Sequence, residues 1–341
     1  MHPALRLIFR RKARHNEIPR AHKRRDERYR MAIEKNGIVV LGAVFVDIKG
    51  FPDGIYIPDG RNAGHVEYIH GGVSRNVAED IANLELRPTF LGIVDDSAMG
   101  EAVIRKLERH KVNTEYMQTI PNGMGTWLAV FDHNGDLAGS ISQRPNLLPI
   151  LDILEEKGDE IIGNCDSVIL EADIDKVIVK KVIQLCKKYQ KKLFGVVSNM
   201  SIAMERRDFL QQFDCFICNQ LEAGLFFSDD YSKKTPQEFE DILAECLKTA
   251  KIPSMVVTMG GDGAVYADMQ GRKGFCPAMK VAVKDTTGAG DAFCAGVSSG
   301  LTYGKTLKKA VEIGTRLAAS VITSSENVCP RFLPGEFGIC C

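Results

Sequence analysis

Four consecutive residues, Gly288, Ala289, Gly290 and Asp291, have types and spacing that could support transfer of a phosphate. The small residues would let backbone N–H groups approach a ligand. They lead into a predicted helix, whose N-terminus adds unpaired N–H donors and a positive dipole end, so the stretch suits an anion. Asp291 would repel that anion, but it could take a proton from a hydroxyl attacking the phosphate. The alternative is a turn whose Asp only caps the helix.

A second set of residues could hold an alcohol. Asp47 closes an apolar run that begins at Gly37, and a carboxylate there is costly unless it is paired or used. A pair of sugar hydroxyls would be a natural partner, although Asp47 could also be a turn residue. Gly71 and Gly72 precede a predicted helix and would allow close approach of a ligand. Asn76 in that helix offers both a donor and an acceptor.

Two further motifs could bind a nucleotide and its metal ion. Asn219 and Glu222 are one helical turn apart, so they share a face and could hold a hydrated Mg²⁺. Ordinary helix capping would use the same two residues. Thr258 and the amides of Gly260 and Gly261 could bind phosphate, or they could form a plain hairpin turn.

Together these motifs resemble the ribokinase (PfkB) family of carbohydrate and nucleoside kinases. The strings that carry the resemblance are D-T-T-G-A-G-D-A-F-x-A-G from Asp285, G-G-x-x-x-N-x-A from Gly71, N-x-x-E from Asn219 and T-x-G-x-x-G-A from Thr258. Their order spans roughly residues 37–335.

The resemblance implies a role for each motif. Asp291 would be the catalytic base, with Gly288, Ala289 and Gly290 as the anion hole. The substrate would contact Asp47, Gly71, Gly72 and Asn76. ATP would contact Asn219, Thr258, Gly260, Gly261, Gly263 and Ser324. Mg²⁺ would be positioned indirectly through Asn219 and Glu222, and a monovalent cation such as K⁺ would bind at Asp285 and Thr287.

The elements that must position these residues predict an α/β protein. A strand at 167–170, a helix at 177–191 and a strand at 192–197 give a β-α-β rhythm, which favours a parallel sheet covered on both faces. An alternating run at 280–283 predicts a strand before the Asp291 loop. Asn-Gly within 133–136 predicts a hairpin turn. With the resemblance, we expect a ribokinase-like three-layer α/β/α fold with a mainly parallel sheet and a small β lid.

The chain divides by composition and resemblance into three parts. Residues 1–35 hold 12 Lys/Arg against 4 Asp/Glu and predict a basic extension, disordered or partly helical. Residues 36–335 would form the kinase domain, with lid segments near 48–70 and 124–144, and residues 336–341 a tail. The formal net charge is zero, so nucleic acid is not an expected partner.

Cysteine usage and hydropathy predict a cytoplasmic protein. The ten cysteines mostly sit in apolar runs, as Cys165, Cys186, Cys246 and Cys294 do, and are expected to be reduced core residues. Cys215 and Cys218 lie in a predicted strand, where residues three apart point to opposite faces, so a metal role is disfavoured. No apolar run is long enough to span a membrane.

The predicted function is ATP-dependent phosphotransfer to a hydroxyl of a sugar or nucleoside. Within the family, the motifs look most like the pseudouridine kinase branch, although Ser198-Asn199 depart from the Asp-Pro of many relatives. A sugar phosphate would need cations, and Arg144 is the one candidate. The alternative is a catalytically silent sugar- or nucleoside-binding regulator that uses the basic arm. A dinucleotide-binding oxidoreductase lacks its G-x-G-x-x-G, and no P-loop motif is present. Family members often form homodimers through the lid.

Overall fold

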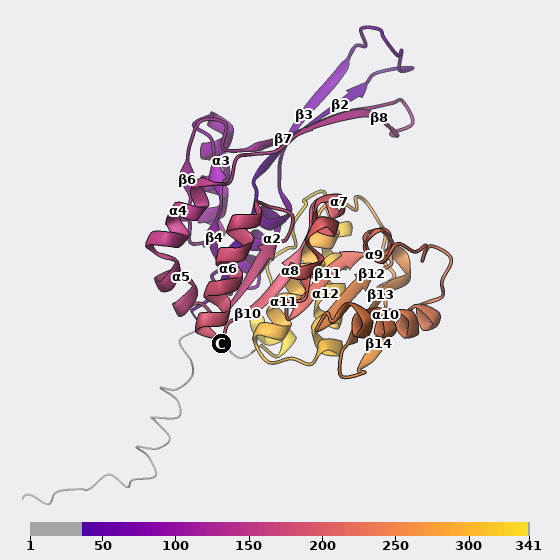
Figure 1. The fold of residues 1–341 in the computed structure, drawn as a ribbon. Helices are drawn as coiled ribbons and strands as arrows, with labels where there is room; N and C mark the ends of the chain where they lie inside the picture. Colours follow the sequence, from indigo (N-terminus) through magenta and orange to yellow (C-terminus); the bar gives the residue numbers. More distant parts are fainter. Residues whose placement is uncertain (1–35, 340–341) are drawn as a thin grey trace, which may run out of the picture. The chain divides into compact units, whose positions relative to one another are not determined.

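The computed structural model describes residues 36–339 of the chain. The predicted basic extension at 1–35 lies outside the described residues, as do Cys340 and Cys341. Figure 1 shows the described part, with helices and strands labelled.

An eight-stranded sheet forms the centre of the fold, in the order β14-β13-β12-β11-β10-β9-β1-β4. The strands from β12 to β4 run parallel, and β13 and β14 are antiparallel. The strands are β1 (Ile38–Leu41), β4 (Thr89–Leu91), β9 (Ser167–Glu171), β10 (Lys192–Val196), β11 (Cys215–Asn219), β12 (Ser254–Thr258), β13 (Gly263–Asp268) and β14 (Lys273–Pro277).

Helices cover both faces of this sheet because its strands are apolar on both sides. In β1, Val39 and Leu41 join one buried cluster, while Ile38 and Val40 join another. The first cluster packs against α4 (Pro149–Glu156), α5 (Gly158–Asn164), α6 (Lys176–Tyr189), α7 (Met200–Ala203), α8 (Arg207–Leu210), α9 (Gln220–Phe227) and α10 (Pro236–Ala250). The second packs against α2 (Val73–Asn83), α3 (Ala98–Arg109), α11 (Ala289–Thr302) and α12 (Leu307–Ile322).

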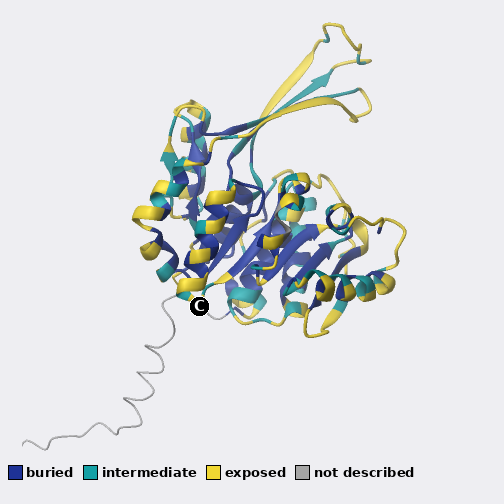
Figure 2. Ribbon diagram, in the orientation of Figure 1, coloured by how far each residue is buried: buried dark blue, intermediate teal, exposed yellow. Residues whose placement is uncertain are grey.

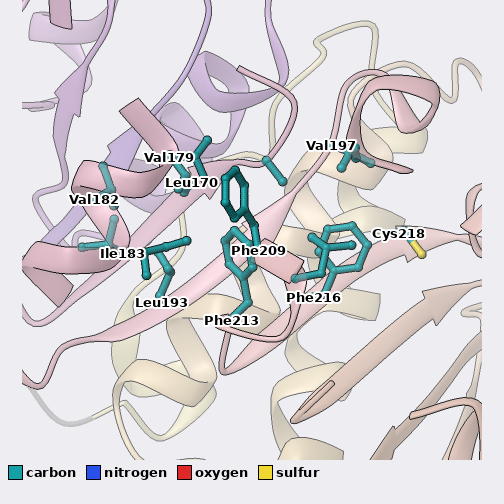
Figure 3. Close-up of a cluster of buried hydrophobic side chains, with 14 of the residues drawn as sticks. Leu170, Val179, Val182, Ile183, Leu193, Val197, Phe209, Phe213, Phe216 and Cys218 are labelled. Carbon is teal, nitrogen blue, oxygen red and sulfur yellow. The ribbon is translucent and has the colours of Figure 1, made fainter. Parts of the chain in front are cut away.

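Figure 3 shows part of the first cluster, where Phe209, Phe213 and Phe216 lie among aliphatic side chains of α6 and the sheet. Cys218 belongs to this cluster and Cys215 to the other, so the two cysteines point to opposite faces as predicted. All eight cysteines among the described residues are free, and six of them are buried. Residues 36–339 contain no helix long and apolar enough to cross a membrane.

A four-stranded lid sheet has the order β3-β2-β7-β8 and confirms the predicted small β lid. Its strands are β2 (Phe45–Pro52), β3 (Gly64–Gly71), β7 (Gly125–Phe131) and β8 (Leu137–Gln143). The hairpin predicted at 133–136 joins β7 to β8. Figure 2 shows that much of this sheet is exposed. A small separate pair is formed by β5 (Ile93–Val94) and β6 (Gln118–Thr119).

One predicted strand is wrong. The run at 280–283 forms no strand and is irregular, with Ala282 and Val283 exposed. Its alternation is a local signal, whereas a strand needs a neighbour with free backbone groups. The segment instead leads from β14 to α11, and the Lys284 amide donates to the Ile322 carbonyl at the end of α12 (2.7 Å).

Short 3₁₀ turns complete the fold at Met204–Arg206 (η1), Gly260–Asp262 (η2) and Pro334–Phe337 (η3). The chain is packed around η3, since the Phe332 and Phe337 rings meet edge to face and Ile339 is buried.

Candidate functional site

The predicted site residues gather where the parallel strands of the large sheet end. Asn219 ends β11 and Thr258 ends β12, and the two are register partners. Ligands of open α/β sheets bind outside these carboxyl ends. The helices α2 and α11 pack against each other and bring their N-terminal turns to the same region. Motifs far apart in the sequence therefore meet at one edge of the sheet.

Asp291 and Asn76 are in direct contact in this region. The Asn76 amide nitrogen donates to Oδ2 of Asp291 across 2.6 Å. Burial raises the pKa of Asp291 to about 7, against the lowering effects of the Asn76 hydrogen bond and of Arg75. The charges of Asp47 and Glu222 also raise it. A carboxylate with a pKa near neutrality suits a general base.

The orientation of Asn76 is set by Asn327, which is not among the predicted site residues. The Asn327 amide nitrogen donates to Oδ1 of Asn76 (3.3 Å) and to the His70 carbonyl (3.0 Å). Because Oδ1 of Asn76 is an acceptor here, its nitrogen is free to donate to Asp291. No local signal marks Asn327, since its loop is a run of generic polar residues.

The loop before α11 requires glycine. Gly288 caps the helix with φ of 80°, and a Cβ there would collide with the Asn327 carbonyl. A Cβ at Gly290 would meet nothing within 4 Å, so the backbone beside Asp291 is open. The predicted helix start is confirmed, because α11 begins at Ala289. The loop therefore presents helix N-terminal backbone next to the candidate base.

Asp47 lies near the start of β2, beside Gly71 at the end of β3. Its side chain is partly exposed, and burial raises its pKa while Lys49 and Arg75 lower it. A Cβ at Gly71 would lie 2.7 Å from an Asp47 oxygen, so the glycine makes room for that carboxylate. Gly72 has φ of 99°, and its Cβ would lie 2.6 Å from the Ala43 carbonyl. Close packing therefore explains the need for glycine at both positions without a bound substrate.

Asn219 and Glu222 form a capping box at the start of α9. The Glu222 amide donates to Oδ1 of Asn219, and the Asn219 amide donates to Oε2 of Glu222, both across 2.8 Å. Direct metal coordination would disturb this box, whereas contact through water would leave it intact. The pair therefore fits the indirect role that was predicted for Mg²⁺. Within the described residues, no group of three acidic, His or Cys side chains could hold a metal ion directly.

The turn between β12 and β13 is open at two of its glycines. A Cβ at Gly260 or Gly261 would meet nothing within 4 Å. Gly263 differs, because its φ is 126° and a Cβ would collide with the Cys276 carbonyl of β14. This geometry explains Gly263 without a ligand and leaves the other two amides beside Thr258 as candidates for phosphate.

The remaining residues predicted to bind ATP or a cation make hydrogen bonds to residues close to them in the sequence. Thr287 donates from its amide (2.9 Å) and hydroxyl (2.8 Å) to Oδ1 of Asp285, and the amide bond is the largest effect that lowers the pKa of Asp285. Ser324 exchanges hydrogen bonds with the backbone of Glu326 and lines a cleft of about 720 Å³. That cleft lies between α2, α3 and the end of α12, and none of the other predicted ATP contacts lines it.

Sequence analysis did not single out two buried acids near the site, Glu171 and Asp173. Glu171 ends β9 and accepts from the Ala43 amide (3.0 Å) and the Ser74 hydroxyl (2.9 Å). Burial, and secondly the charge of Asp173, raise the pKa of Glu171 to about 7. Its second oxygen has no hydrogen-bond partner in the described structure. The signal that pointed to Asp47 could have found Glu171, since both close apolar strands.

Asp173 contacts Ser198, where the sequence departs from the Asp-Pro of many relatives, and Arg144. It accepts from the Ser198 amide (3.0 Å) and hydroxyl (2.8 Å) and pairs with the Arg144 guanidinium (3.1 Å). Arg144, the cation considered for a sugar phosphate, is therefore already neutralised by a carboxylate.

Comparison with known proteins identifies the class. Residues 35–329 match the model of the pfkB family carbohydrate kinases, and the chain belongs to that family. It is a carbohydrate or nucleoside kinase, a phosphotransferase with an alcohol group as acceptor.

Named relatives refine this class. The chain is 35% identical over 294 residues to guanosine-inosine kinase of Exiguobacterium acetylicum, covering 86% of this chain and 96% of the relative. It is 23% identical to pseudouridine kinase of Escherichia coli, over 78% and 84% of the two chains. The predicted likeness to the pseudouridine kinase branch is therefore corrected, because the guanosine-inosine kinase is markedly more similar.

A solved structure supports the fold. Arabidopsis thaliana ribokinase, complexed with ribose and ATP, matches with a TM-score of 0.76 at 19% identity, covering 89% of this chain and 98% of the other. The predicted ribokinase-like α/β fold is confirmed.

Proposed function

We propose that this kinase transfers the γ-phosphoryl group of ATP to the primary hydroxyl of a nucleoside, with purine nucleosides foremost. The single observation that carries the chemistry is the contact between Asn76 and Asp291, with the pKa of Asp291 near 7. The substrate class rests on the likeness to a guanosine-inosine kinase.

Asp291 acts as the base in this proposal. Its carboxylate takes the proton of the primary hydroxyl as the oxygen attacks phosphorus. The attacking oxygen therefore does not build up positive charge. At the start of α11 the N–H groups of Gly288 and Gly290 offset charge on the transferred group, while that of Ala289 also donates to the Thr286 carbonyl (3.2 Å). Asn76 orients the carboxylate through its 2.6 Å hydrogen bond.

The substrate is held by the lid and by α2. Asp47 accepts hydrogen bonds from the sugar hydroxyls, and the sugar reaches from Asp47 to Asp291. The glycines Gly71 and Gly72 keep the strand end close to the Asp47 carboxylate. Holding the hydroxyl beside its base lowers the entropic part of the barrier.

Several residues fit ATP and its cations. Thr258 and the open amides of Gly260 and Gly261 would hold phosphates beside Asn219, and Gly263 and Ser324 complete the predicted contacts. When bound, ATP supplies the phosphoryl group and Mg²⁺ neutralises its charge. Asn219 and Glu222 would position that ion through water, and Asp285 and Thr287 would bind a monovalent cation such as K⁺.

The test is ATP consumption with inosine, guanosine, pseudouridine, ribose and fructose 6-phosphate as acceptors. Turnover with a purine nucleoside is expected, and Asp291→Asn should reduce kcat by roughly 10²- to 10⁴-fold, the usual worth of a positioned base. The matched control is Asp159→Asn, which removes an exposed carboxylate paired with Lys188 on α5 and α6. Full activity in Asp291→Asn would overturn the assignment. ATP binding without turnover on any acceptor would favour the silent regulator.

We also propose that a second copy of the chain packs on the outer face of the lid. Register pairs align Tyr68, Ile48, Leu128 and Ile141 in one row across all four lid strands. Ile48 packs against the second buried cluster, and the other three are exposed. Tyr68 is 62% exposed and Ile141 is 70% exposed. Apolar side chains gathered on one face of a sheet indicate a protein contact, and this row supports the predicted homodimer.

A further inference from the structure

Trp127 lies beside Asp47 on the inner face of the lid. In the parallel pair of β2 and β7, Trp127 is the register partner of Asp47, and Ile69 of β3 is the partner on the other side. Registered neighbours in a sheet point to the same face, and the strands are about 4.8 Å apart. Trp127 is partly exposed and is the only tryptophan in the chain.

This inner face is the one that looks toward the candidate base. The Asp47 carboxylate occupies the space beside Gly71 at the end of β3. The neighbouring His70 carbonyl accepts from Asn327, which also donates to Asn76, the hydrogen-bond partner of Asp291. Trp127 shares the face of Asp47, whereas its chain neighbour Leu128 points to the opposite face in the Tyr68 row. The indole is therefore on the substrate side of the lid.

Other aromatic rings of this face are already engaged. Phe51 stacks on Phe131 with ring centroids 4.8 Å apart, and on His65 at 5.2 Å. None of the ring-to-ring contacts found among the described residues of the lid includes Trp127. Trp127, the register partner of Asp47, is partly exposed and takes no part in these ring contacts.

From this placement we infer that Trp127 is the platform for the nucleobase and that it sets the preference for nucleosides over free sugars; the inference rests on the proposed function. In a nucleoside, the base is attached to the carbon next to the one that bears the 2′-hydroxyl. A sugar whose hydroxyls bind Asp47 would therefore carry its base toward the adjacent strand, where Trp127 lies. Stacking on indole needs only a π-face.

The platform has a consequence for specificity. Free ribose would bind through Asp47 and Asn76 alone and would leave the indole uncovered. A purine offers a larger face than a pyrimidine, so purine nucleosides should bind best and ribose worst. Stacking does not read the edge of the base, and inosine and guanosine should therefore differ little at Trp127.

A binding experiment tests this without turnover. Since Trp127 is the only tryptophan, the intrinsic fluorescence of the full chain reports its surroundings alone. Inosine and guanosine should quench it with a saturable curve, excited at the red edge of the tryptophan band, whereas ribose should not. No change at concentrations that protect the enzyme from thermal unfolding would overturn the inference.

Substitutions separate stacking from general damage. Trp127→Ala should raise KM for inosine by roughly 5- to 150-fold, the range for loss of one base–aromatic stack, with KM for ATP and for ribose unchanged. Trp127→Phe keeps a π-face and should recover most of the affinity. An equal rise in KM for ribose and inosine, or no rise for inosine, would overturn it. Failure of the wild type to phosphorylate any acceptor would count against the proposed function, while the fluorescence titration would still decide the role of Trp127.

Discussion

At the scale of single residues, the chemistry depends on the protonation of Asp291. Its pKa is raised to about 7, first by burial, and the Asn76 hydrogen bond is the largest effect that opposes this. The base form is the carboxylate. Activity should therefore be low well below pH 7, rise through pH 7 and level off above it.

Removing the hydrogen bond tests this linkage. Asn76→Ala deletes the donor that favours the carboxylate, so the pKa of Asp291 should increase and the rising limb of kcat/KM should move to higher pH. The measurement is the midpoint of that limb, compared with wild type and with Asn113→Ala, which removes an exposed amide of the loop after α3. A midpoint that stays in place, or moves to lower pH, would contradict the assigned base.

The residues that sequence could and could not reveal differ in how local their signals are. Asp291, Asn76 and Asp47 stand beside glycines or at the ends of apolar runs, and such patterns are visible in a few residues. Asn327 orients Asn76 from 251 positions away in the sequence, and no pattern in the neighbouring residues predicts that contact. The capping box of Asn219 and Glu222 could be predicted, but the sequence left open whether it also serves a metal ion.

At the scale of elements, α2 is held by an ion pair that lies wholly inside the protein. Arg75 and Glu79 are one turn apart, 2.6 Å from each other, and both are at most 1% exposed. Arg75 also donates to the carbonyls of His70 and Gly71, at the end of β3 beside Asp47. The second Glu79 oxygen lies 3.2 Å from Lys106 of α3. The pair therefore connects α2, α3 and the lid.

Breaking this pair should be costly. Glu79→Gln leaves the Arg75 charge buried without its counter-ion, and we expect a loss of about 3–5 kcal/mol in the free energy of unfolding, measured by urea titration. Glu101→Gln breaks an equally spaced but exposed pair with Arg105 on α3 and should cost under about 1 kcal/mol. Equal losses in the two variants would show that the buried pair is not what anchors α2.

Elements were predicted well where their pattern reflects burial and less well where it does not. The helix predicted at 177–191 and the strands on either side of it are present, because each has an apolar face that the sheet covers. The run at 280–283 has the alternation of a strand but no partner to pair with, so it remains irregular. The apolar run at 89–94 divides at Gly92, where β4 stays in the large sheet and β5 leaves to pair with β6.

At the scale of the whole molecule, the β-α-β rhythm predicted a parallel sheet covered on both faces, but not the order of its strands. Strand order depends on which backbone edges meet, and β1 pairs with β9 across more than a hundred residues. The lid came from the resemblance rather than from periodicity. Periodicity did not predict the lid in part because apolar residues are exposed on its outer face. They obscure the usual alternation of buried apolar and exposed polar residues along a strand.

The outer face of the lid is the predicted contact of a homodimer. If a second copy covers the row of Tyr68 and Ile141, the chain should have twice its own mass in sedimentation equilibrium. The double variant Tyr68→Asp, Ile141→Asp should be monomeric, because each half of the contact would then bury two like charges. Val177→Asp is the control, since Val177 is an exposed apolar residue on α6 rather than on a lid strand. A wild type that stays monomeric at all concentrations would refute the dimer, as would a charged variant that keeps the double mass. A monomeric variant that still phosphorylates nucleosides would show that each inner face, with Asp47 and Trp127, works without the partner.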